Sequence, residues 1–176
     1  MTDQYNRRKF LKRTTQAGLG LAFGNIVVPA DAAPGLAPLE TYPFQSSKLE
    51  KVRIGMVGVG WMGTSHVRNF LNIEGCEIVA VCDIVKSRVE RAQQMAVEAG
   101  FPKPDGYSRG ELDYKRMCER EDIDLVFIST PWRWHVPMCL EAMNTGKHAA
   151  TEVPAAQTIE ECWQLVETAE STGKYC

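Results

Sequence analysis

The sequence predicts an α/β fold, a doubly wound parallel sheet with helices on both faces. Short apolar runs alternate with amphipathic helical patterns over most of the 176 residues, in the order strand, helix, strand, helix. These runs are hydrophobic on both faces, which is typical of strands buried inside a parallel sheet. A glycine-rich turn, Gly58-Val59-Gly60-Trp61-Met62-Gly63, joins the first strand to the first helix. A turn at the end of such a strand lies where open α/β sheets bind ligands.

The glycine turn has the G-x-G-x-x-G spacing of a dinucleotide-binding motif, and it stands in the strand–turn–helix context that this motif requires. Gly58 permits the tight turn, Gly60 lets a pyrophosphate approach the backbone, and Gly63 lets helix and strand pack closely. The anion would lie at the helix N-terminus. A glycine-rich turn also occurs where nothing binds, so the motif needs a second signal.

Asp83 supplies that second signal. It follows the apolar run Glu77–Cys82 and stands twenty residues after Gly63, where a dinucleotide fold places the carboxylate that binds the adenine ribose. Alternatively, Asp83 is the N-cap of the next helix, and both roles are compatible. A carboxylate here repels the 2′-phosphate of NADP. Ser87 and Arg88 would weaken that preference, but we predict NAD as the cofactor.

The segment after Asp83 predicts two helices separated by a loop. The first helix, 86–99, carries apolar residues at helical spacing and stops at Gly100. The loop over 101–110 contains at most a short strand near Tyr107. Ser108 and Glu111 are spaced as a capping box for a second helix. That helix would carry Leu112, Tyr114, Lys115 and Cys118.

The last third of the chain predicts two more strand–helix units. Strands are expected over 124–129 and 147–151, and the helix between them runs to Gly146. A capping box, Thr158 with Glu161, opens the final helix. Its apolar face is expected to contain Ile159, Cys162, Trp163, Val166 and Ala169, with Trp163 in the core. Lys174–Cys176 resembles the first residues of one more strand. We therefore expect this chain to stop before the last strand or strands of the sheet and before a C-terminal α/β substrate domain.

The N-terminus has the pattern of an export signal. Arg7-Arg8 precedes a weakly apolar run, 17–28, and Ala30-Asp31-Ala32 offers a cleavage site. The run is too short for a membrane anchor, and a disordered basic tail would not need the cleavage site. We predict a twin-arginine signal peptide over 1–32, a linker over 33–50 and an incomplete NAD-binding Rossmann domain over 51–176. The protein is expected to be periplasmic or secreted, without stable membrane insertion after cleavage, and to load NAD before export.

The composition argues against several other classes of function. The chain is 44% hydrophobic and 24% charged with a formal charge of −2, and no basic patch interleaved with aromatic residues points to nucleic acid. The six cysteines include no C-x-x-C pair and no metal-ligand spacing with the three histidines, so we expect no metal site and no disulfide. His66, inside the first helix, and His148, on a strand, are interpreted as structural.

Four motifs together resemble the glucose–fructose oxidoreductase and inositol dehydrogenase superfamily. They are the glycine turn, Asp83, Thr130-Pro131 with His135, and Glu152-Val153-Pro154. In that superfamily the T-P-x-x-x-H turn lies along the nicotinamide half of the cofactor. The next strand normally ends in E-K-P, whose lysine is placed for proton relay. Here that position is Val153, which cannot transfer a proton, so lysine-dependent sugar dehydrogenation is disfavoured.

Four segments resemble glycoside hydrolase family 109 more closely: VRIGMVGVGWMGTSHVRNF, Glu121-Asp122-Ile123-Asp124-Leu125, TPWRWHVPM and TEVPAAQTIEECWQLV. Known members of that branch are α-N-acetylgalactosaminidases, and the branch has E-V-P and W-x-W-H at these places. Trp132 and Trp134 are core aromatics or walls of the cofactor site, and we favour walls. His135 is expected to cap the following helix or bind the cofactor rather than act as a base. The cofactor contacts predicted from motif and resemblance are Gly58, Gly60, Trp61, Met62, Gly63, Asp83, Thr130, Trp132, Arg133, Trp134, His135, Glu152 and Val153.

The resemblance implies a glycosidase that uses NAD without net redox change. The expected route is oxidation of the sugar at C3, elimination across C1 and C2, water addition and re-reduction, which makes such enzymes exceptions to the two-carboxylate rule. The catalytic residues and the glycoside-binding domain are expected beyond Cys176. A periplasmic NAD(P)-dependent sugar oxidoreductase is the alternative, and a non-catalytic binding module is the third possibility. Formation of a homo-oligomer is a further expectation.

Overall fold

The computed structural model describes residues 49–176. The predicted signal peptide over 1–32, and the linker over 33–50 apart from its last two residues, lie outside the described residues. None of the helices in the described part of the chain is both long and apolar enough to span a membrane.

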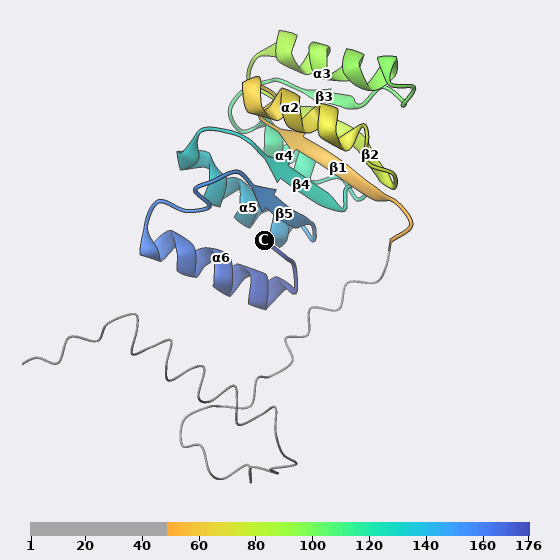
Figure 1. The fold of residues 1–176 in the computed structure, drawn as a ribbon. Helices are drawn as coiled ribbons and strands as arrows, with labels where there is room; N and C mark the ends of the chain where they lie inside the picture. The colour runs from red at the N-terminus through yellow and green to blue at the C-terminus, as the bar shows by residue number, and fades with distance from the viewer. Residues whose placement is uncertain (1–48) are drawn as a thin grey trace, which may run out of the picture. The chain divides into compact units, whose positions relative to one another are not determined.

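The centre of the fold is a five-stranded parallel sheet with the order β3-β2-β1-β4-β5 (Figure 1). Its strands are β1 (Val52–Val57), β2 (Cys76–Cys82), β3 (Asp105–Tyr107), β4 (Leu125–Ile128) and β5 (His148–Thr151). From β1 the chain builds outward through β2 to β3, then returns to the other side of β1 to form β4 and β5. This order confirms the predicted doubly wound sheet. The order in which strands are added to the sheet changes direction between β1 and β4. The carboxyl ends of these two parallel strands flank the crevice where such sheets bind ligands.

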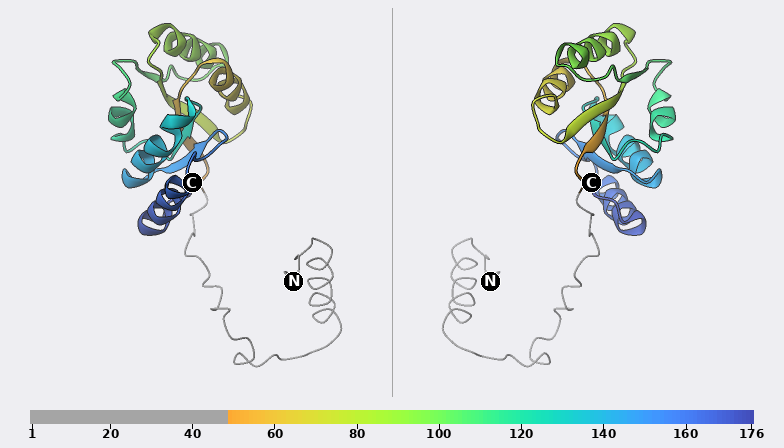
Figure 2. Two further views of the ribbon diagram at one scale, coloured as in Figure 1. Left: turned by 90° about the vertical axis from the view of Figure 1, so that its left-hand side faces the viewer. Right: turned by 90° about the vertical axis from the view of Figure 1, so that its right-hand side faces the viewer.

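Helices cover both faces of the sheet, as Figure 2 shows. Helices α2 (Trp61–Phe70) and α3 (Lys86–Glu98) lie on one face, and α4 (Asp113–Cys118) and α5 (His135–Asn144) lie on the other. A short 3-10 helix, η2 (Trp132–Trp134), leads into α5, and α6 (Ile159–Thr172) packs against α5.

Alternation along the strands divides the core into two clusters. Ile54 and Met56 of β1 point to the face covered by α2 and α3, where they meet Val67 and Val89. Val57 belongs to the other cluster, with Val126 and Ile128 of β4 and the apolar side of α5. The strands are buried on both faces, which explains why their sequences are continuous apolar runs.

The predicted capping box at Ser108–Glu111 is wrong. Helix α4 begins at Asp113 and has no side-chain cap. Instead, the carboxylate of Asp113 accepts hydrogen bonds from the backbone N–H of Arg109, at 2.9 Å, and from the Arg116 side chain, at 2.9 Å. Asp113 is 8% exposed, and the two bonds satisfy its buried carboxylate. The carboxylate of Asp113, rather than the side chain of Ser108 or Glu111, therefore accepts the hydrogen bonds at the start of α4.

The final helix confirms one prediction and contradicts another. The capping box is present, with the Glu161 N–H donating to Thr158 Oγ1 at 3.1 Å, and Gly173 ends the helix in the left-handed conformation. Trp163 does not lie in the core, because it is 60% exposed, and Leu165 is the buried residue of α6. The helix contacts α5 on the side that carries Leu165 and Ala169, and this leaves Ile159 and Val166 exposed.

The predicted strand over Lys174–Cys176 is not formed. These three residues have no regular secondary structure. The Ala149 N–H donates to the Tyr175 carbonyl at 2.9 Å, and the Tyr175 N–H donates to His148 Nδ1 at 3.0 Å. These bonds place Tyr175 beside β5, but the segment does not form a strand.

Candidate cofactor site

The glycine turn between β1 and α2 depends on two of its glycines for packing. Gly58 has a φ of +79°, and a Cβ there would lie 2.6 Å from the Ser129 carbonyl oxygen. A Cβ at Gly63 would lie 1.9 Å from the Gly58 carbonyl oxygen. At Gly60, by contrast, the nearest atom to such a Cβ is 3.6 Å away, in the Arg88 guanidinium. The turn is therefore closed at both ends and open to a ligand at its middle glycine.

The N-terminus of α2 suits an anion. The helix follows Gly60 directly, has no side-chain cap and carries no acidic residue in its first turn. Its partial positive charge is therefore not neutralised by its own residues. Arg91 reaches the turn from α3 and donates to the Val59 carbonyl at 3.1 Å and to Thr64 Oγ1 at 2.8 Å. These bonds hold the outer side of the turn in place.

Asp83 lies at the end of β2 with its carboxylate beside the glycine turn, and it is 7% exposed. Oδ2 accepts from the Val59 N–H at 3.0 Å, and Oδ1 accepts from the Val85 N–H at 2.8 Å. The Arg88 guanidinium lies 3.6 Å from Oδ1. The N-cap residue of α3 is Val85, so the alternative interpretation of Asp83 as an N-cap is wrong. The carboxylate connects the end of β2 to the glycine turn, and each of its oxygens is held by a backbone N–H.

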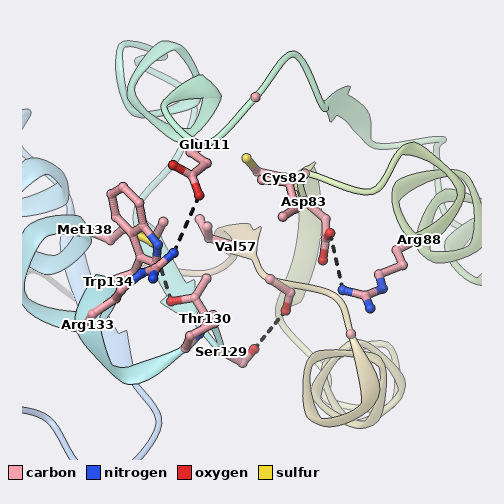
Figure 3. A pocket seen from close by; sticks show the side chains of 15 residues that line it. Val57, Cys82, Asp83, Arg88, Glu111, Ser129, Thr130, Arg133, Trp134 and Met138 are labelled. Carbon is pink, nitrogen blue, oxygen red and sulfur yellow. Dashed lines mark hydrogen bonds and ion pairs between the residues drawn. The ribbon is translucent and has the colours of Figure 1, made fainter.

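A cavity of about 180 Å³ opens at the carboxyl ends of β1, β2 and β4 (Figure 3). Its lining combines the glycine turn, the end of β2 and the segment that leads into α5. The lining residues are Val57, Gly58, Gly60, Cys82, Asp83, Ile84, Arg88, Gly110, Glu111, Ser129, Thr130, Pro131, Arg133, Trp134 and Met138. Burial raises the pKa of the Cys82 thiol to about 12, so this side chain is a neutral part of the wall rather than a nucleophile.

The far wall of the cavity is formed by Thr130, Arg133 and Trp134. The Arg133 guanidinium lies 5.8 Å from the centre of the Trp134 ring and 3.6 Å from Glu111, as Figure 3 shows for the ion pair. On its other side Trp134 makes an edge contact with Tyr114, with 6.2 Å between ring centres. Trp134 is therefore both a packed aromatic and a wall of the cavity. Trp132 is 59% exposed and does not line it.

His135 is fully buried at the first turn of α5. Its Nε2 lies 2.8 Å from the Thr130 carbonyl oxygen and its Nδ1 lies 2.8 Å from the Pro154 carbonyl oxygen. Trp134 is the N-cap residue, with no side-chain cap, so the expectation that His135 caps α5 is wrong. Carbonyl oxygens only accept and a neutral imidazole carries one N–H, so the ring donates to at least one of them and lies between the segments after β4 and β5. Its predicted contact with the cofactor stays a prediction.

Six of the predicted cofactor residues meet around this cavity, and the others lie elsewhere. Those that line it are Gly58, Gly60, Asp83, Thr130, Arg133 and Trp134. Trp61 and Met62 are exposed at the start of α2, by 85% and 44%, and Val153 is 80% exposed after β5. Gly63, Trp132, His135 and Glu152 are also outside the lining.

Sequence reasoning missed Glu111, Met138 and the wall role of Arg88. Arg88 had a detectable signal, since it stands in the first turn of the helix that follows Asp83. No local pattern marks Glu111, which reaches the site from the loop before α4.

Within residues 49–176 no group of three or more histidine, cysteine, aspartate or glutamate side chains is arranged to hold a metal ion. The groups in and beside the cavity instead suit a dinucleotide: they offer a carboxylate for a ribose, an open glycine and a free helix N-terminus for a pyrophosphate, and an aromatic and cationic wall. The comparisons with known proteins agree with this assignment.

The chain is 44% identical over 97% of its length to glycosyl hydrolase family 109 protein 1 of Shewanella sp. (strain ANA-3), and 44% identical to the alpha-N-acetylgalactosaminidase of Shewanella oneidensis. It spans 38% of the length of each of these relatives. Among solved structures it resembles myo-inositol dehydrogenase from Lactobacillus casei in complex with NAD(H) and myo-inositol, with a TM-score of 0.60 and 30% identity, covering 69% of this chain and 34% of that one. Scyllo-inositol dehydrogenase from the same organism, with bound NAD(H), gives a TM-score of 0.60 at 27% identity over 70% of this chain and 34% of that one.

Residues 52–176 match the Gfo/Idh/MocA family, described as an oxidoreductase family with an NAD-binding Rossmann fold. The match covers β1 to the end of the chain, including both walls of the cavity. The predicted resemblance and the predicted cofactor, NAD, are thereby confirmed. The chain belongs to the Gfo/Idh/MocA oxidoreductase family, and residues 52–176 are its NAD-binding Rossmann domain.

Proposed function

We propose that this chain is the NAD-binding part of a glycosidase that cleaves α-linked N-acetylgalactosaminides with its own bound NAD. The observation that carries the proposal is Val153, which stands after β5 where the wider family keeps a proton-relaying lysine. A valine side chain can neither accept nor release a proton. The 44% identity to a relative named alpha-N-acetylgalactosaminidase supports this substrate class. The chain spans 38% of that relative's length.

The residues of this chain bind and orient the cofactor and leave proton transfer to other groups. Asp83 would accept from the adenine ribose, the N–H groups at the start of α2 would hold the pyrophosphate, and Trp134 with Arg133 would form one wall. Cys82 stays protonated and takes no part. Bound NAD would supply one reversible hydride transfer at C3 of the sugar, which acidifies the C2 proton so that the C1 substituent can leave by elimination. Addition of water across C1 and C2, followed by return of the hydride to C3, would complete a hydrolysis with no net change in redox state.

The reaction is tested by following a released aglycone, the NADH absorbance and isotope incorporation together. The protein should cleave an α-N-acetylgalactosaminide without accumulating NADH. In heavy water the released sugar should gain deuterium at C2, because elimination breaks that C–H bond and direct displacement at C1 does not. Removing NAD should abolish cleavage, and adding it back should restore cleavage. Hydrolysis without C2 label would contradict the elimination route. Steady NADH formation from a free sugar without glycoside cleavage would instead establish a sugar oxidoreductase.

We also propose export by the twin-arginine route, from Arg7, Arg8 and the weakly apolar run that follows them. Replacing both arginines by lysine should retain the precursor in the cytoplasm, because that route recognises the arginine pair rather than its charge. Cell fractionation with immunoblotting would measure the distribution. The matched control replaces Lys9 and Lys12 by arginine, which also keeps the charge, and should be exported normally. Normal export of the Arg7→Lys, Arg8→Lys variant would exclude this route.

A further inference from the structure

His66 of α2 makes a hydrogen bond to the residue that follows β5. Its Nε2 contacts Glu152 Oε1, and the contact becomes an ion pair when the ring is protonated. The two side chains are 22% and 26% exposed, so the contact is mostly sheltered from solvent. The residues are 86 positions apart in the chain. The bond therefore joins the helix of the glycine turn to the E-V-P segment, which local sequence patterns do not connect.

Both partners are held in place by packing that is independent of the bond. The His66 ring lies on Phe127 of β4, with 4.6 Å between ring centres, and Phe127 is in edge contact with Phe70 at 5.2 Å. The Glu152 N–H donates to the Ile128 carbonyl at 3.0 Å, which continues the pairing of β5 with β4. Because the ring and the Glu152 backbone are already ordered, the remaining conformational cost of the bond is that of fixing the Glu152 side chain.

The segment after Val153 is held as well. The Pro154 carbonyl oxygen lies 2.8 Å from Nδ1 of the buried His135, whose other nitrogen faces the Thr130 carbonyl. Residues on both sides of Val153 are thus attached to the rest of the domain by a histidine. Val153 itself is 80% exposed. Because its neighbours on both sides are held, the exposed side chain of Val153 has a defined position on the surface.

The Glu152 carboxylate is directed to His66 and is not part of the cavity lining. It therefore acts on the site through the position of the main chain rather than as a charge next to a ligand. The two segments that it connects would contact different parts of a dinucleotide. The glycine turn and α2 would hold the pyrophosphate, and the end of β5 lies on the side of the sheet beyond the switch point, away from Asp83.

We infer that His66 is a positioning residue that sets the Glu152–Pro154 turn at a fixed distance from the glycine turn, so that the nicotinamide end of NAD is held against Val153. The inference rests on the proposed function in one respect, the placement of nicotinamide beside Val153. It assigns His66 no contact with the cofactor and no proton transfer. Its consequence is that loss of the bond weakens binding of NAD without weakening binding of ADP-ribose, which lacks the nicotinamide.

The test is the ratio of NAD to ADP-ribose affinity, measured by calorimetry on the purified protein. His66→Leu has a similar volume but no donor, and it should weaken NAD binding about tenfold, the loss expected for one hydrogen bond to a charged group, with ADP-ribose binding unchanged. His66→Gln places an amide N–H close to the position of Nε2 and should restore much of the NAD affinity. Glu152→Leu should reproduce the effect of His66→Leu, and the double variant should be no weaker than either single one.

The matched control is His148→Leu, at the opposite end of β5, which should leave the affinity ratio unchanged. An unfolded fraction lowers the number of binding sites for both ligands but does not change the ratio of their affinities. A partly unfolded variant can therefore still be used in this test. Equal weakening of both ligands, or no change in either, would overturn the inference. The ratio of NAD affinity to ADP-ribose affinity is measured without a glycoside. Failure to cleave glycosides would therefore contradict the proposed function but not the inference about His66.

Discussion

Replacing Asp83 by alanine is expected to weaken NAD binding by about 1.5–3 kcal/mol, the usual range for a hydrogen bond to a charged group, or roughly 10- to 150-fold. The carboxylate lies at the edge of the cavity and is the acceptor best placed for a ribose hydroxyl. Its loss also frees the Val59 N–H and the Val85 N–H, so the glycine turn becomes less ordered. Titration calorimetry with NAD measures the effect directly.

The control for Asp83→Ala is Asp122→Ala, which removes an aspartate that pairs with Arg120 and does not line the cavity. That variant should bind NAD normally. Asp83→Asn keeps a side-chain acceptor and should fall between wild type and alanine. Unchanged NAD affinity in Asp83→Ala would remove this residue from the ribose site.

Gly63→Ala is expected to lower the free energy of unfolding by about 2–3 kcal/mol or more, near the upper end of the range for overpacking. The new Cβ would lie 1.9 Å from the Gly58 carbonyl oxygen, which is backbone and cannot move aside without opening the turn. Denaturant unfolding followed by circular dichroism measures the loss. NAD binding should fall as well, because the displaced turn carries the N–H groups that would hold the pyrophosphate.

Gly60→Ala is the matched comparison, because its Cβ would meet nothing closer than 3.6 Å. Stability should change by less than about 1 kcal/mol, the scale of an unstrained glycine replacement, while NAD affinity should fall because the methyl group lies where the pyrophosphate approaches. Wild-type stability in Gly63→Ala would show that the turn adapts, contrary to this expectation.

The element order was predictable from sequence because each element carries its own periodic signal. Apolar runs of strand length, helical spacing in between and stops such as Gly100 and Gly146 are local, and both glycines have the positive φ that favours glycine. The capping box of Thr158 and Glu161 was correct for the same reason, since its partners are three residues apart. The capping box predicted for Ser108 and Glu111 was wrong because α4 begins only at Asp113, with Leu112 as its N-cap residue, so both residues lie before the helix.

The candidate site was predictable only in part. The glycine turn and Asp83 form a known spacing on consecutive elements, and the structure places them within hydrogen-bond distance, Val59 to Asp83 at 3.0 Å. The far wall depends on how distant segments meet. Glu111 joins Arg133 at that wall, and His66 joins Glu152 outside the cavity lining; neither pair shares a local pattern.

By itself, the sequence determined the order of strands and helices, the glycine turn, the carboxylate after β2 and the cofactor class, because these depend on spacing along consecutive residues. Only the tertiary structure decided which residues face the cavity and which side of a helix is buried. Helical spacing identifies an apolar stripe but not what covers it, so Trp163 was assigned to the core although α6 rests on α5 through Leu165. The position of His135 was decided in the same way. Its two carbonyl partners lie in segments 19 and 5 residues away and meet only because β4 and β5 are adjacent in the sheet.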